Sequence, residues 1–169
     1  MAMSPRLDVA LHLIESARAY MLQLIADVDD SQWFTIPPGA STHLAWQVGH
    51  LAMAEYGLTM IRMRGKEPSD ADFITNAFMR TFKKGSTPQP DPSLYPAPEE
   101  IRQTLADVHA QALRELPGYD DSTLDEPLPE PYAGFATRLG SLYFCAAHEM
   151  LHAGQIGALR RMLGKDPLR

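Results

Sequence analysis

The sequence of 169 residues contains a single cysteine, Cys145, so it cannot form an internal disulfide. A lone cysteine is typical of a reducing compartment, and we therefore expect a cytoplasmic protein. Long apolar runs are also missing: no stretch approaches the roughly 18 apolar residues of a membrane-spanning helix. The amino-terminal stretch has neither the apolar segment nor the cleavage site of a signal peptide. These absences predict a soluble protein without a membrane partner.

Positive charge is scarce as well. The chain has 15 Lys and Arg against 21 Asp and Glu, a formal net charge of −6. Its most basic stretches, Arg62-Met-Arg64 and Arg160-Arg161, are short and fall at the ends of expected helices, where cations interact favourably with the helix dipole. A nucleic-acid-binding protein needs a basic stripe that neutralises phosphates. We therefore expect no nucleic-acid partner.

The sequence also lacks an alternating strand pattern and an internal repeat. Apolar residues instead recur at the three-four spacing of amphipathic helices. We expect four long helices: 7–28, from an N-cap at Ser41 or Thr42 to Arg64, 99–116 and 137–163, with a short extra helix within 70–82. The length fits one domain, residues 1–169. The favoured fold class is all-α, a four-helix bundle.

Two long connections are rich in proline. Residues 83–98 contain five prolines, and residues 120–134 include the run Glu126-Pro-Leu-Pro-Glu-Pro131. Proline removes a backbone donor and disfavours regular helices, so both segments are expected to be loops. Long loops in a compact domain are often functional. The first could therefore shape or cover a cleft.

The motif His148-Glu-Met-Leu-His152 lies within the last expected helix. Residues four apart on a helix lie on the same face, about one turn from each other. The two imidazoles could therefore bind one divalent metal, but a secure site needs at least one more ligand.

Four other histidines are candidates for that third ligand. His50 borders the apolar stripe of the second helix, near small residues that leave room for an ion; a neutral core histidine is the alternative. His109 also borders a buried stripe and is either a packed core residue or a ligand. His12 shares a polar face, so a surface role is expected for it. His43 lies in the first turn of the second helix, where either a capping or a surface role is expected.

The roles of two residues beside the histidine pair remain open. Cys145 lies three residues before His148, and could be a soft fourth ligand, a redox-sensitive neighbour or a small core residue. Glu149 lies about 100° around the helix from His148. It could orient a ligand, act as a catalytic base, form a salt bridge or face solvent.

The same motif matches H-E-x-x-H, the signature of zinc proteases. Those enzymes take a third ligand from downstream of the motif. Only 17 residues follow His152, and they contain no Glu and no His. A zinc protease is therefore not expected, and the third ligand is sought among the histidines earlier in the chain.

A histidine within Trp46-Gln-Val-Gly-His50-Leu-Ala, followed by His148-Glu-Met-Leu-His152-Ala-Gly-Gln155-Ile, resembles the DinB/YfiT-like superfamily over essentially the whole chain. This resemblance implies a four-helix bundle of up-down-down-up topology, often a homodimer, that holds a divalent metal on His50, His148 and His152. It also implies an enzyme that uses a low-molecular-weight thiol, because characterised relatives include thiol-dependent transferases and isomerases.

Three neutral imidazoles suit zinc, nickel or iron(II), and leave positions open for a substrate or water. The leading hypothesis is a metal-dependent enzyme, a thiol S-transferase or a hydrolase using metal-bound water, with a small-molecule substrate. A non-catalytic bundle that binds a metal or small ligand is the main alternative. A purely structural interaction module is the third.

Overall fold

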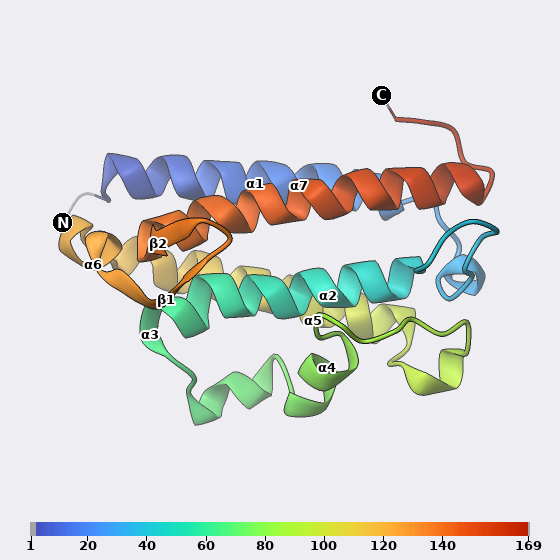
Figure 1. Ribbon diagram of the computed structural model, residues 1–169, viewed down its shortest axis with the longest axis horizontal. Coiled ribbons are helices and arrows are strands. Elements are labelled where there is room, and N and C mark those ends of the chain that lie inside the picture. Colours follow the sequence, from blue (N-terminus) through green and yellow to red (C-terminus); the bar gives the residue numbers. More distant parts are fainter. Residues whose placement is uncertain (1–2, 169) are drawn as a thin grey trace.

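The computed structural model describes residues 3–168, and four long helices dominate it (Figure 1). They are α1 (Pro5–Ile25), α2 (Leu44–Tyr56), α5 (Pro98–Glu115) and α7 (Arg138–Met162). Helix α1 lies along α7, α2 lies along α5, and α2 also packs against α7. The all-α fold class is confirmed, and no helix of residues 3–168 combines the length and apolarity needed to cross a bilayer.

The helices begin where polar side chains accept hydrogen bonds from free backbone N–H groups. Thr137, the expected first residue of the last helix, caps α7, with its hydroxyl accepting from the backbone N of Gly140 at 3.2 Å. The predicted cap of α2 at Ser41 or Thr42 is wrong. His43 takes that position instead, because its extended backbone lets its Nδ1 accept from the backbone N of Trp46 at 3.1 Å.

Helix α2 does not stop at Tyr56 but continues through a π-helical segment, η2 (Gly57–Ile61), into α3 (Arg62–Arg64). Gly65, with φ of +85°, then ends the helix, as predicted from its position after Arg64. The π-helical turn was not predicted. It widens the helix locally, and such turns occur frequently at functional sites.

Short elements fill the two long connections. Between α3 and α5 lie η3 (Pro68–Asp72), α4 (Asn76–Thr81) and η4 (Pro92–Leu94). The helix expected within 70–82 is thus split, and its α-helical part is α4. The remaining short elements are η1 (Asp30–Gln32), η5 (Leu116–Gly118) and α6 (Asp121–Asp125).

The expectation that residues 120–134 form only a loop is wrong. Strands β1 (Pro127–Tyr132) and β2 (Phe135–Thr137) pair as an antiparallel hairpin that packs against α7. Its tip is formed by Ala133 and Gly134, with φ of +51° and +84°. Two successive positive φ values match the twist of a tight hairpin. The three prolines of β1 can be tolerated because a two-stranded sheet consists of edge strands.

Candidate metal centre

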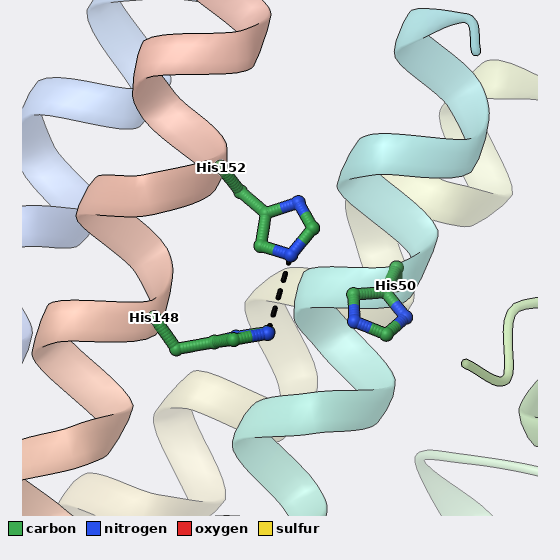
Figure 2. A group of neighbouring side chains, drawn as sticks. All are labelled: His50, His148 and His152. Carbon is green, nitrogen blue, oxygen red and sulfur yellow. Dashed lines mark hydrogen bonds between the residues drawn. The ribbon is translucent and has the colours of Figure 1, made fainter. Parts of the chain in front are cut away.

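The structure brings together the three histidines that the sequence indicated. His50 projects from α2, while His148 and His152 project from successive turns of α7 (Figure 2). One ring nitrogen from each lies within 4.8 Å of the other two. The Nε2 atoms of His148 and His152 are 3.2 Å apart. The three side chains therefore form one cluster between α2 and α7.

This spacing fits a divalent metal ion. Zinc binds imidazole nitrogen at about 2.0–2.1 Å, so two ligand atoms in a tetrahedral site lie roughly 3.3 Å apart. The separation of 3.2 Å between the Nε2 atoms of His148 and His152 already matches that value. His50 offers a ring nitrogen within 4.8 Å of the other two, which exceeds the ideal separation by roughly 1.5 Å at most.

The orientation of His50 is set by three neighbours. Its Nδ1 lies 2.8 Å from the backbone oxygen of Phe82, so Nδ1 carries the proton and Nε2 keeps a free lone pair. The ring of Trp46 stacks on the imidazole at 4.8 Å with an interplanar angle of 9°. Phe82 can approach because Gly49 has no side chain; a Cβ there would lie 2.5 Å from its ring.

His152 is oriented by a chain of two glutamines. Gln155 accepts a hydrogen bond from Nε2 of Gln47 at 3.0 Å, which turns Oε1 of Gln47 towards His152. That oxygen accepts from His152 Nδ1 at 2.5 Å. A hydrogen bond that protonates one ring nitrogen fixes the other as the ligand atom. Both His50 and His152 are thus prepared to bind through Nε2.

The surroundings of the three histidines also keep their side chains neutral. Burial, together with the neighbouring His50 and Lys84, lowers the pKa of His148 to about 4. Burial, with His148 and His50 beside it, lowers the pKa of His152 to about 3. Burial likewise lowers the pKa of His50. Neutral imidazole is the form that binds metal, so the site is ready for an ion at neutral pH.

The histidines form part of the wall of a cavity of about 720 Å³. This volume is in the range of small-molecule binding sites. Apolar side chains from α2, the hairpin and α7 make up most of the remaining wall: Trp46, Met53, Ala54, Leu58, Tyr132, Ala133 and Phe144. The expectation that a long connection helps to shape a cleft is supported at Lys83 and Lys84, which line its edge.

The other histidines lie elsewhere. His12 is exposed on α1, as predicted. Of the two roles expected for His43, the structure shows the cap of α2, and its buried side chain contradicts the surface role. His109 is partly buried on α5, where its Nδ1 is 2.7 Å from a carboxylate oxygen of the buried Glu55. Of the two roles left open for His109, packing without metal is the one that its position supports.

Glu149 points away from the cavity into a buried ionic cluster. Its carboxylate binds Arg18 of α1, which also binds Glu55 of α2 at 2.7 Å. Glu55 in turn contacts His109 of α5, so each long helix contributes one member. Cys145 is buried nearby, and burial raises the pKa of its thiol well above the usual value. It is a core thiol rather than a reactive thiolate.

Sequence reasoning missed two contributors to the site. The backbone oxygen of Phe82 leaves no trace in residue types, because any residue supplies a carbonyl. Gln47 could have been found: it is a polar residue on the inward face of α2, three positions before His50, where an amide needs a buried partner.

A comparison with protein families bears on this geometry. The family model described as the DinB superfamily matches residues 13–156, a range that contains all three histidines. The chain belongs to the DinB superfamily. The resemblance drawn from Trp46 to Ala52 and from His148 to Ile156 is therefore confirmed.

One solved structure extends the comparison for this DinB-superfamily protein. The crystal structure of a conserved protein from Enterococcus faecalis is similar with a TM-score of 0.71 and 16% sequence identity, covering 94% of this chain and 97% of that one. This likeness concerns the fold. No curated protein matches the sequence.

Proposed function

We propose that this DinB-superfamily protein is a divalent-metal-dependent enzyme, and that its activity is a thiol S-transferase reaction on a small molecule. The proposal rests on one observation: His50, His148 and His152 converge at the wall of a cavity large enough for a thiol and an electrophile. Three protein ligands leave a coordination position open, which is typical of catalytic rather than structural sites.

Zinc, nickel or iron(II) bound by the three histidines would stabilise the thiolate form of a thiol cofactor, the nucleophile of S-transfer. The chain's own residues have the remaining tasks. Phe82 and Gln47 keep the imidazoles of His50 and His152 oriented. Trp46 and Phe144 cover the apolar sides of the cluster, which limits the access of water.

A hydrolase remains the second candidate within this proposal, but one observation favours S-transfer. Many metal-dependent hydrolases use a carboxylate as general base, as the H-E-x-x-H proteases do. No Asp or Glu side chain lines the cavity among the described residues, and Glu149 is bound to Arg18. Transfer from a preformed thiolate does not need such a base.

Finer features of the molecule belong to the same proposal: one domain folded as a four-helix bundle of up-down-down-up topology. In Figure 1, α1 and α7 run in one direction and α2 and α5 in the other, which supports that topology. A cytoplasmic location fits the single buried cysteine.

We also propose a homodimer. Its support is a set of exposed apolar side chains on the neighbouring helices α1 and α7, including Val9, Leu13 and Met150. Light scattering coupled to size-exclusion chromatography would test it. A concentration of about 100 μM is well above the usual Kd of a stable dimer, so a protein that is still monomeric there would contradict the proposed homodimer.

Metal content is the first test of the enzyme proposal. Protein purified without a histidine tag should carry about one equivalent of metal, or take it up after dialysis, as measured by atomic emission. The double variant His50→Ala/His148→Ala should lose it. His12→Ala removes an exposed imidazole on α1 and should retain it. Equal metal contents in all three proteins would contradict a site at the cluster.

Activity is the second test. Low-molecular-weight thiols would be screened against electrophiles with the metal-loaded protein. Saturable turnover that disappears in His152→Ala supports the S-transferase. Tight binding of a thiol without turnover would instead support the alternative, a non-catalytic DinB-superfamily protein that binds a metal or small ligand.

A further inference from the structure

The cavity beside the histidine cluster has a charge opposite to that of the whole protein. The chain carries a formal net charge of −6. Yet the charged residues that line this cavity are all cations, Arg62, Lys83 and Lys84, and within residues 3–168 none of the three is paired with a carboxylate. Unpaired cations around a partly apolar cavity attract an anionic ligand.

Arg62 is held in a defined position. Its Nη1 donates to the backbone oxygen of Gly57 at 3.0 Å, and its guanidinium lies 4.3 Å from the centre of the Tyr132 ring. Only one of its five N–H groups is used in these contacts. The remaining donors can form the paired hydrogen bonds that a guanidinium makes with a carboxylate or phosphate. Arg62 is therefore a preformed anion site.

The side chain of Arg62 turns back towards the histidines. Its contact with Gly57 places the guanidinium seven residues after His50 along the same helix. At 1.5 Å per residue this corresponds to about 10 Å from the histidine cluster. Small residues between the two, Ala54 and Gly57, keep that side of the cavity open. A ligand can thus span the distance.

We propose that the substrate of this site is an elongated small molecule with an apolar body and a terminal carboxylate or phosphate, which binds Arg62 while the reacting end lies at the histidines. The proposal rests on the proposed function, since it names the substrate class of the same cavity. Lys84, close enough to act on His50 and His148, favours negative charge at the reacting end as well.

The distance between the two ends makes the proposal testable with thiols of graded length. Cobalt(II)-loaded protein would be titrated with 3-mercaptopropionate, 6-mercaptohexanoate and 8-mercaptooctanoate, and with the alcohols of equal length. Sulfur-to-cobalt charge-transfer absorption reports the thiol. The six- and eight-carbon carboxylates should bind about tenfold more tightly than their alcohols, as one charge-assisted bidentate contact provides. The three-carbon acid is too short to reach Arg62 from the histidines, so it should bind no more tightly than its alcohol.

Variants then test whether Arg62 causes the tighter binding of the long carboxylates. Arg62→Gln should abolish the advantage of the long carboxylates and leave the alcohols unchanged, while Arg62→Lys, which keeps the charge but not the planar fork, should retain part of it. Arg161→Gln removes an exposed cation far along α7 and should retain all of it. Equal affinities of acids and alcohols, or equal losses for both in Arg62→Gln, would overturn the proposal.

A metal-independent arm separates this proposal from the proposed function. Metal-free protein would be titrated with 6-phenylhexanoate and 6-phenylhexanol, followed by the fluorescence of Trp46, which lines the cavity. Preference for the acid that is lost in Arg62→Gln supports the anion site even if no thiol gives a charge-transfer band. If thiols do give that band but acids and alcohols bind equally in both arms, the anion proposal fails and the metal site stands.

Discussion

Arg18 of α1 donates two hydrogen bonds to Glu149 of α7, from Nε to Oε1 at 2.6 Å and from Nη2 to Oε2 at 3.2 Å. Glu149 directly follows His148, but successive residues of a helix point about 100° apart. The histidine therefore faces the cavity while the glutamate faces the interior. Of the roles that the sequence left open for Glu149, the salt bridge is the one present, and it connects α1 to α7.

This pairing predicts that Glu149→Gln is a stability variant. It leaves Arg18 buried with one carboxylate partner instead of two, Glu55 being the other. Breaking a buried ion pair typically costs 3–5 kcal/mol, and glutamine keeps one acceptor, so we expect a loss of about 2–3 kcal/mol in the free energy of unfolding. Urea denaturation measures it. Metal affinity should change by less than about threefold, as for a residue outside the site.

The matched control is Glu15→Gln, which neutralises an exposed carboxylate on α1. It should alter the free energy of unfolding by no more than about 0.5 kcal/mol. If Glu149→Gln instead kept full stability and lost metal tenfold, Glu149 would have to be placed in the metal site.

The hydrogen bond from His152 to Gln47 predicts that Gln47→Leu weakens metal binding. Leucine offers no acceptor, so the Nδ1 proton of His152 loses its partner and the ring is free to change tautomer. Loss of such a partner typically costs 10- to 100-fold in metal affinity. Competition with a chromophoric zinc chelator would measure it. Gln23→Leu, at an exposed position of α1, is the control and should bind zinc like the unmodified protein.

Residue types and spacing were sufficient to predict the four long helices and the histidine pair of α7. The last helix was expected over 137–163 and occupies Arg138–Met162, between the cap at Thr137 and Gly164 with its positive φ, because helix ends depend on local chemistry. His148 and His152 were predictable as a pair because they share a helix face, and residues 153–169 contain no Glu or His that could be the third ligand. The place of His50 beside the apolar stripe of the second helix made it a candidate, and the family resemblance selected it over His109.

Other features depend on contacts between distant segments. The π-helical turn at Gly57–Ile61 does not change the apolar pattern of α2 and so left no signal. The hairpin was not predicted because the three prolines of β1 are typical of a loop, although edge strands also tolerate proline. Gly49 admits the ring of Phe82, a contact across 33 residues that no local pattern reveals.

The stability of the end of α3 should depend on pH through Asp70. Burial raises the pKa of this carboxyl, but hydrogen bonds from Arg64, the backbone N of Glu67 and Tyr56 outweigh it and lower the pKa to about 2, from a reference of 3.8. Its contribution is therefore complete above pH 3.8 and is lost as the pH falls through 2. The difference corresponds to about 2 kcal/mol.

Denaturation of the wild-type protein and Asp70→Asn at several pH values tests this. The wild type should be more stable by about 2 kcal/mol near pH 6, with the advantage shrinking towards zero near pH 2. Asp72→Asn, at an exposed position in the same segment, should differ from wild type by less than about 0.5 kcal/mol. An advantage of Asp70 that grows as the pH falls would contradict the assignment.

Gly49 and Gly154 give a pair of glycine-to-alanine changes with opposite expected signs. At Gly49 a Cβ would lie 2.5 Å from the ring of Phe82, whereas at Gly154 on α7 no atom lies within 4 Å. Gly49→Ala should lose about 1–3 kcal/mol through overpacking. It should also weaken metal binding, because Phe82 holds His50 through its backbone oxygen. Gly154→Ala should gain up to about 1 kcal/mol, since alanine favours the helix, with metal affinity unchanged. Thermal unfolding of both variants measures stability, and competition with a zinc chelator measures metal affinity. A Gly49→Ala protein with undiminished stability and zinc affinity would show that Phe82 does not position His50.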